Sequence, residues 1–106
     1  MIRMYTGSDG ITHLEDMDAA EMRLPAKEMV IRSNANKLPS PWHNAPFKQI
    51  LIVRTGSVKI EVEDGTVRQL GPGDLVLEED LTGKGHRALP VDNEPVLLTA
   101  VVLASE

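Results

Sequence analysis

The stretch that decides the fold runs from residue 42 to residue 86 and reads WHNAPFKQILIVRTGSVKIEVEDGTVRQLGPGDLVLEEDLTGKGH. Within it, short runs of β-branched and aliphatic residues are separated by corners of glycine, proline and aspartate. Short strands with turn signals between them are typical of an all-β barrel or sandwich. A histidine lies near each end of the stretch, so we expect His43 and His86 to meet at the mouth of one small barrel.

The strands are predicted from the hydrophobic pattern. Residues 57–63 alternate cleanly, with Val58, Ile60 and Val62 on one face. Further strands are expected at 29–32, 48–54, 75–78, 87–89 and 96–103. Residues 1–25 are predicted to form either a short amphipathic helix or an extended segment, because so short a hydrophobic pattern fits both.

The turns are predicted from their residue types. Asp64-Gly65 predicts a two-residue type I′ hairpin, because that turn needs positive φ at both central positions. This hairpin would place Val62 opposite Val67 and Glu61 opposite Arg68. Pro72-Gly73 suits the centre of a type II turn, and Gly83-Lys84-Gly85 is predicted as a turn that needs positive φ.

Two of the predicted strands, 49–53 and 96–103, are apolar on both faces. One face fills the barrel, where we expect Leu51, Val53 and Val101, and the other must also be covered. The cover is either the N-terminal segment or a second copy of the chain, and we expect a homodimer. The predicted organisation is therefore an N-terminal segment, 1–27, packed on the barrel or on the partner, and a barrel over 28–106.

The composition bounds the class of protein. With 106 residues the chain is expected to form one domain. Sixteen acidic and eleven basic residues give a net charge of -5, and no run of basic residues predicts a nucleic-acid partner. The absence of cysteine excludes thiol catalysis, zinc-thiolate sites and disulfides. Because no signal peptide and no apolar run long enough to span a bilayer is visible, we expect a cytoplasmic protein without membrane association.

The motifs from about residue 38 to residue 103 resemble those of the cupin family. The family's first motif has two histidines one residue apart, then a glutamate and a glycine. Here His43 takes the first histidine position, Ala45 replaces the second histidine, Gln49 replaces the glutamate, and Gly56 has the right spacing.

The second cupin motif has a proline, a glycine two residues later and a histidine three residues after that. Here Leu81 replaces the proline, while Gly83 and His86 match. The resemblance implies a small single-domain cupin with a degenerate metal motif. The implied fold is a double-stranded β-helix, or jelly-roll, barrel that holds a metal or a small ligand inside.

A metal is the first chemistry that the resemblance implies. His43 and His86 would supply imidazole ligands and Gln49 a neutral amide oxygen, which is a poor ligand. His13 or Glu79 would complete the set if the fold brings either near. The metal would be a divalent transition ion such as Fe, Mn, Ni or Zn.

A metal-free pocket is the second interpretation. A histidine works as acid or base near neutral pH, so His43 and His86 are the candidate catalytic residues, with Glu79 or Asp80 orienting His86. The predicted substrate-binding residues are Trp42, His43, Gln49, Leu51, Glu79, Lys84 and His86. The competing interpretation is that residues 78–80 form a solvated loop and that Lys84 points to water.

The expected function is binding of a small organic molecule inside the barrel. As an enzyme, the protein would be a metal-dependent or acid/base catalyst of the isomerase, cyclase or oxygenase type. The alternative is a non-catalytic module that binds or senses a small molecule without metal. The barrel fold supports many functions, so the sequence leaves the choice open.

Overall fold

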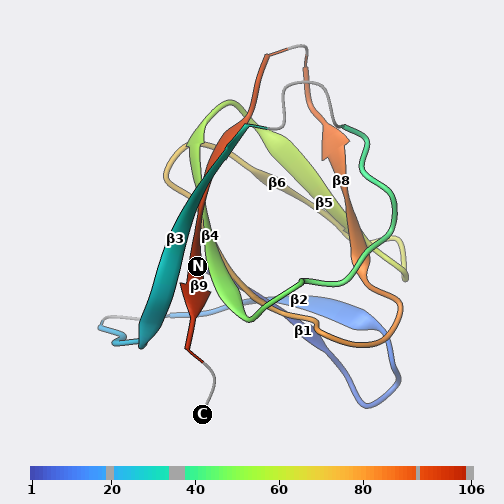
Figure 1. Ribbon diagram of the computed structural model, residues 1–106. Helices are drawn as coiled ribbons and strands as arrows, with labels where there is room; N and C mark the ends of the chain where they lie inside the picture. The colour runs from blue at the N-terminus through green and yellow to red at the C-terminus, as the bar shows by residue number, and fades with distance from the viewer. Residues whose placement is uncertain (19–20, 34–37, 93, 105–106) are drawn as a thin grey trace.

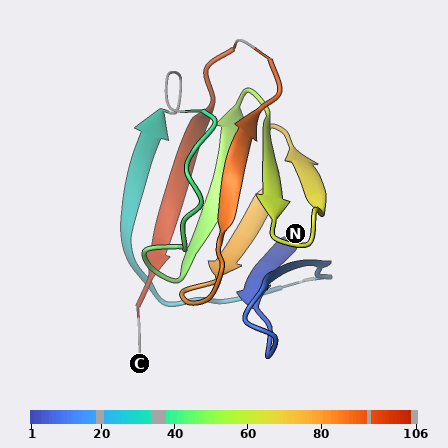
Figure 2. The same ribbon diagram turned by 90° about the vertical axis from the view of Figure 1, so that its right-hand side faces the viewer.

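The computed structural model describes residues 1–18, 21–33, 38–92 and 94–104, which form two facing β-sheets (Figures 1 and 2). The larger sheet has the strand order β2-β1-β7-β4-β9-β3, and the smaller has the order β6-β5-β8. The strands are β1 (Ile2–Thr6), β2 (Thr12–Asp16), β3 (Ala26–Ser33), β4 (Gln49–Thr55), β5 (Val58–Val62), β6 (Val67–Leu70), β7 (Leu75–Glu79), β8 (His86–Pro90) and β9 (Leu97–Leu103). The predicted all-β class is therefore confirmed. Among the described residues, no helix is long and apolar enough to cross a bilayer.

Residues 40–43 complete the smaller sheet along the free edge of β8. The backbone N–H groups of Ser40 and His43 donate to the carbonyls of Ala88 and His86, each at 2.9 Å. In chain order, β3, residues 40–43, β4, the β5–β6 hairpin, β7, β8 and β9 alternate between the two layers. Two four-stranded layers connected in this way make a jelly roll.

The N-terminal hairpin extends the larger sheet beyond β7. Strand β1 runs parallel to β7, with Ile2 beside Val76, and β2 pairs antiparallel with β1. The extended form of this segment is confirmed, because Ile2 and Met4 bury one face of β1 in the core. The core also contains Val53, Val58, Ile60, Leu70, Val76, Val96 and Leu98.

The β5–β6 hairpin differs from the predicted type I′ turn. Gly65 has a φ of +90°, whereas no other residue type in the described chain has positive φ, so Asp64 keeps an ordinary conformation. The Gly65 N–H donates to the Val62 carbonyl at 3.0 Å, which is the pattern of a type I turn followed by a left-handed glycine. The extra loop residue shifts the register, so that Glu61 lies opposite Val67 rather than Arg68.

Two other turn predictions are confirmed. Gly73 has a φ of +89°, and the Asp74 N–H donates to the Gly71 carbonyl, as a type II turn requires. Gly83 and Gly85 have φ values of +83° and +78°. Both conformations favour glycine because a side chain would meet the backbone.

The face of strand β9 that points into the barrel is the opposite of the predicted one. Val101 lies opposite Ile50 of β4, whereas Ala100 lies opposite Leu51, which faces inward. Paired residues of neighbouring strands point to the same side of a sheet, so Val101 belongs to the outer face. Leu98 takes the interior position instead. A strand that is apolar on both faces carries no signal for which face is inside.

Gly85→Ala should destabilise the protein more than Gly65→Ala. Both residues have positive φ, which costs an alanine about 1–2 kcal/mol. A Cβ at Gly85 would also lie 2.4 Å from the His43 carbonyl oxygen, whereas nothing lies within 4 Å at Gly65. Urea unfolding of the two variants measures the difference. Equal losses would contradict the close approach of the two backbones at Gly85.

Candidate functional site

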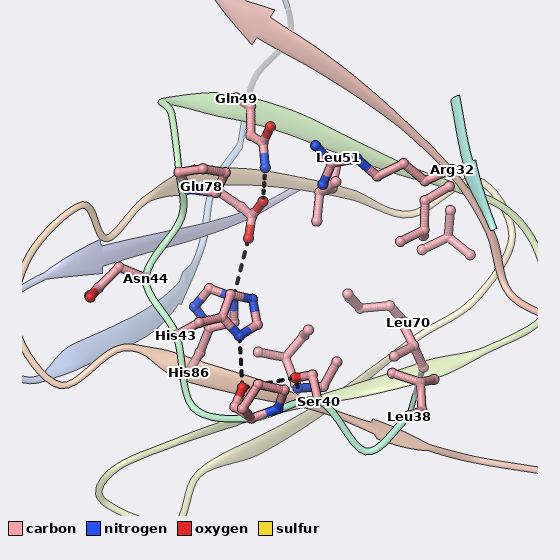
Figure 3. Close-up of a pocket in the computed structure, with 17 residues that line it drawn as sticks. Arg32, Leu38, Ser40, His43, Asn44, Gln49, Leu51, Leu70, Glu78 and His86 are labelled. Carbon is pink, nitrogen blue, oxygen red and sulfur yellow. Dashed lines mark hydrogen bonds and ion pairs between the residues drawn. The ribbon is translucent and has the colours of Figure 1, made fainter. Parts of the chain in front are cut away.

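A cavity of about 450 Å³ lies between the two sheets (Figure 3). Its apolar wall comes from both sheets and consists of Leu38, Pro41, Pro46, Leu51, Val53, Val58, Ile60, Leu70, Ala88 and Leu98. Its polar lining residues are Arg32, Ser40, His43, Asn44, Gln49, Glu78 and His86. A mostly apolar cavity of this size with a few polar groups is typical of a small-molecule site.

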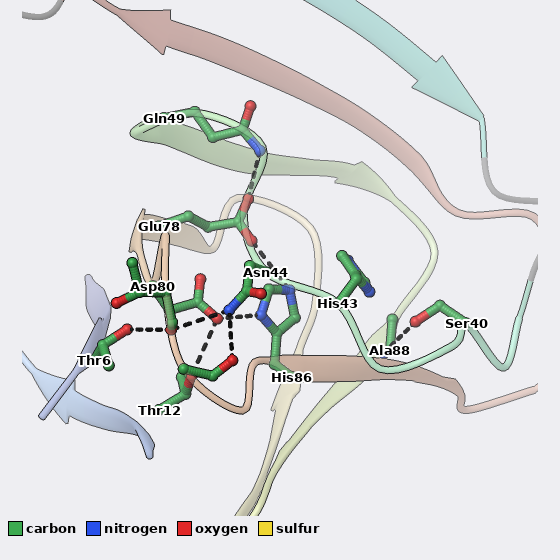
Figure 4. Close-up of polar contacts among 12 residues, drawn as sticks. Thr6, Thr12, Ser40, His43, Asn44, Gln49, Glu78, Asp80, His86 and Ala88 are labelled. Atoms are coloured by element: carbon green, nitrogen blue, oxygen red, sulfur yellow. Dashed lines mark hydrogen bonds and ion pairs between the residues drawn. The ribbon is translucent and has the colours of Figure 1, made fainter. Parts of the chain in front are cut away.

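A chain of buried polar side chains forms one end of the cavity (Figure 4). Gln49 Nε2 donates to Glu78 Oε1 at 2.6 Å, and Glu78 Oε2 lies 3.4 Å from His86 Nε2. On the other side of the imidazole, His86 Nδ1 donates to Asp80 Oδ2 at 2.6 Å. Thr12 Oγ1 donates to the same oxygen at 3.1 Å. We call these five residues the buried polar chain.

The larger sheet positions most of this chain. Gln49 of β4 lies directly opposite Glu78 of β7, so their side chains share one face. Asp80 follows Glu78 by two residues and therefore points to the same side. Thr12 reaches Asp80 from the N-terminal hairpin, which brings residues far apart in the sequence into one cluster.

The two histidines meet because their backbones pair. His43 and His86 exchange two N–H to carbonyl bonds of 2.9 Å, and their ring centroids lie 4.5 Å apart. His43 Nδ1 donates to the Pro41 carbonyl at 2.8 Å. That bond leaves His43 Nε2 as a hydrogen-bond acceptor.

The loop between β7 and β8 is held from three sides. Asn44 Nδ2 and Thr6 Oγ1 both donate to the carbonyl of Thr82, at 3.0 Å and 2.8 Å. The backbone N–H of Lys84 donates to the Gly10 carbonyl at 3.1 Å. These bonds fix the loop that leads into His86.

Burial of Glu78 raises the pKa of its carboxyl above the usual range. The opposing effects of the His86 charge and of the Gln49 hydrogen bond are smaller. A protonated Glu78 would direct its proton toward His86 Nε2, because Gln49 binds the other oxygen. The Glu78 carboxyl thus lies between the Gln49 amide and the His86 imidazole.

Four of the predicted substrate-binding residues line the cavity, namely His43, Gln49, Leu51 and His86. Trp42, Glu79 and Lys84 are not among its lining residues. The indole of Trp42 instead lies under the guanidinium of Arg87, at 5.3 Å. The roles predicted for all seven residues stay predictions.

Three residues considered in the sequence analysis do not line the cavity, namely Glu79, Lys84 and His13. Burial disfavours ionisation of Glu79, but hydrogen bonds from Arg3 and Lys48 outweigh it and hold the pKa of Glu79 below its usual range. Lys84 is exposed. His13 Nε2 lies 2.9 Å from a carboxylate oxygen of Asp9, in the N-terminal hairpin.

The interpretation of residues 78–80 as a solvated loop is wrong for Glu78 and Asp80. They are 3% and 0% exposed, and of the two carboxylates considered as partners of His86, Asp80 makes the bond. The sequence does carry a signal for this burial. Val76, Glu78 and Asp80 share one face by period-two spacing, and Val76 is a core residue.

The donor groups of the buried polar chain fit a divalent cation. Glu78, Asp80 and His86 each offer one ligand atom, and these atoms lie within 4.8 Å of one another. Two buried oxygens, Gln49 Oε1 and Asp80 Oδ1, have no hydrogen-bond partner among the described residues. Carboxylate and imidazole donors are those of Fe, Mn, Ni and Zn sites. This group differs from the predicted set of His43, Gln49 and His86, which shares only His86 with it.

Glu78→Gln should make stability less dependent on pH. The folded state holds the Glu78 proton more tightly than the unfolded chain, so wild-type stability falls as the pH rises above about 4.5 toward the raised folded pKa. A glutamine retains the acceptor for Gln49 and offers an N–H to His86 without a titrating group. In urea unfolding from pH 4 to pH 8, the free energy of unfolding of the variant should rise relative to that of the wild type as the pH rises.

Glu63→Gln, at an exposed position, is the matched control and should leave the pH profile unchanged. An equal loss of stability in Glu78→Gln at every pH would contradict a protonated, buried Glu78.

No family model and no curated protein matches the chain. Among solved structures, the chain is similar to a Cupin 2 conserved barrel domain protein from Salinispora arenicola CNS-205. The two are 22% identical, the match covers 88% of this chain and 89% of that one, and the TM-score is 0.46. The strand order given above identifies the architecture on its own. The chain has a jelly-roll fold, the architecture to which cupin barrels belong.

Proposed function

We propose that this protein binds a small organic molecule in the cavity between its sheets and transfers protons on it through His86. The reaction class is isomerisation or cyclisation by acid/base catalysis. The observation that carries the proposal is the 2.6 Å bond from His86 Nδ1 to the buried carboxylate of Asp80. An acid/base histidine works best when a carboxylate fixes its tautomer in this way.

Asp80 leaves His86 Nε2 as the basic atom. With its proton on Nδ1, the imidazole presents the Nε2 lone pair on the side where Glu78 and the cavity lie. When Nε2 takes a proton, the carboxylate of Asp80 stabilises the imidazolium that forms. Thr12 holds the same carboxylate oxygen and keeps its orientation.

Glu78 supplies the complementary acid. Burial raises the pKa of its carboxyl and so favours the protonated form, which would donate a proton to the substrate while His86 removes one. The imidazolium proton then returns to the Glu78 carboxylate across 3.4 Å, which restores both groups. The cycle conserves protons and needs no co-reactant.

Two other residues complete the binding site in this proposal. His43 offers Nε2 as an acceptor beside the His86 ring. Gln49 offers the amide oxygen that has no partner among the described side chains. The leucine and valine side chains of the wall would hold the nonpolar part of the ligand.

A metal-dependent enzyme is the second candidate, supported by the proximity of Glu78, Asp80 and His86. These three residues would hold the cation, which would polarise a substrate oxygen when bound. The third candidate is a binding module without catalysis. It uses the same cavity and needs no reacting group.

His86→Gln should abolish proton transfer while leaving ligand binding nearly intact. The measurement is exchange of substrate C–H for deuterium in D₂O, followed by NMR over a panel of small carbonyl compounds. Loss of the general base should lower the exchange rate by about 10²- to 10⁴-fold. Asp80→Asn should also lower the rate and shift the tautomer of His86, which imidazole ¹⁵N chemical shifts report.

His13→Gln, outside the cavity, is the control and should exchange at the wild-type rate. Unchanged exchange in His86→Gln would contradict the role of His86, and no exchange by the wild type on any compound bound in the cavity would favour the binding module. Stoichiometric metal in protein purified without a tag, lost in the Glu78→Ala/His86→Ala variant, would favour the metal enzyme instead.

A homodimer through the outer face of the larger sheet is part of the proposal. Met29 and Ile31 of β3 are 64% and 66% exposed and alternate with Arg32, which lines the cavity, so they lie on the outer face. The N-terminal hairpin pairs with the edge of β7. Exposed apolar side chains clustered on a sheet favour a second copy of the chain as their cover.

Light scattering at micromolar concentration should give twice the chain mass of 11.6 kDa. Met29→Glu/Ile31→Glu should shift the mass to that of one chain, because charges on the outer face would oppose burial. Val67→Glu, an exposed position on the smaller sheet, is the control. A wild-type mass of one chain would contradict the dimer.

A further inference from the structure

Among the described residues that line the cavity, Arg32 is the one lysine or arginine. It lies on β3 opposite Leu98, another lining residue, so its side chain enters the cavity from the larger sheet. Figure 3 shows the guanidinium beside Leu51, away from the imidazoles of His43 and His86. A strand at the sheet edge therefore projects a cation toward an apolar wall.

No side chain of the described residues satisfies Arg32. It makes no ion pair or hydrogen bond with them, whereas Arg3, Arg23, Arg68 and Arg87 each bind a carboxylate. Of the lining residues that the structure describes, Glu78 alone carries a carboxylate, and its two oxygens face Gln49 and His86 instead. Arg32 is exposed, and none of the described side chains binds its guanidinium, so its donors are available to a ligand in the cavity.

We infer that the ligand of this cavity is an organic carboxylate with a nonpolar body, held at its charged end by Arg32. A guanidinium binds a carboxylate through two parallel N–H bonds, which fixes the orientation of the ligand. The described part of the lining has a single cation and neither a second basic residue nor a glycine-rich loop, which matches a monoanion better than a phosphate.

The inference rests on the proposed binding function and adds the substrate class. With the carboxylate at Arg32, the nonpolar body would lie against Leu38, Leu51 and Leu70. The far end of the ligand would then reach the buried polar chain, where His86 and Glu78 exchange protons. The negative group is thereby kept away from Asp80, which would repel it.

The test compares 3-phenylpropanoate with 3-phenylpropanamide, which have the same shape and differ in charge. Binding to the full chain is followed at pH 7.5 by NMR of the methyl groups of Leu51 and Leu70. The carboxylate should bind about tenfold more tightly than the amide, because a hydrogen bond to a charged group is the difference. Arg32→Gln should remove this advantage, so that the two compounds bind with similar affinity.

Arg32→Lys should retain part of the preference, because it keeps the charge and loses the paired geometry. Arg54→Gln is the matched control, since Arg54 is exposed on β4 and does not line the cavity. Equal affinity of wild type for both compounds, or an unchanged preference in Arg32→Gln, would overturn the inference and leave the binding function standing. Absence of methyl shifts with both compounds would overturn the inference and the binding function together.

Discussion

The fold and the site both depend on the backbone pairing of His43 with His86. Two hydrogen bonds of 2.9 Å join these residues and close the smaller sheet on residues 40–43. Without them β8 would be an exposed edge strand, which natural sheets avoid. The pairing also sets the two imidazole rings 4.5 Å apart, and Gly85 permits it because no side chain stands between the two backbones.

The buried polar chain carries a large desolvation cost, since two carboxylates lie out of water. The hydrogen bonds of Gln49, His86 and Thr12 offset part of that cost. Burial raises the pKa of the Glu78 carboxyl, whereas the Asp80 carboxylate accepts the hydrogen bonds of His86 and Thr12.

The cavity thus has two chemically distinct parts. The β7–β8 side bears Glu78 and His86, and β3 bears the Arg32 cation. The N-terminal hairpin supports the first part, because it supplies Thr12 and binds the loop before His86. In the proposed function, a ligand that spans both parts is oriented by Arg32 and exchanges protons with His86 and Glu78.

The sequence by itself determined the strands after residue 25 and most corners of this protein, because alternation and glycine-proline turns are local signals, whereas residues 1–25 fitted both a helix and an extended chain. The convergence of residues 43 and 86 also followed from their places at the two ends of one barrel. The sequence did not predict the register of the β5–β6 hairpin or which face of β9 points inward. A loop of one extra residue shifts every cross-strand pair, and a strand apolar on both faces does not say which is inside.

Only the tertiary structure decided the composition of the candidate site. Glu78 and Asp80 look like part of an exposed acidic run, and their burial depends on pairing with β4 and on Thr12 from a distant hairpin. Nothing in the sequence marked Arg32 as a cavity residue. Its side chain points inward because β3 alternates in a register that is set by pairing with β9. Local patterns determine which segments form strands, whereas long-range packing determines which charged side chains meet in a cavity.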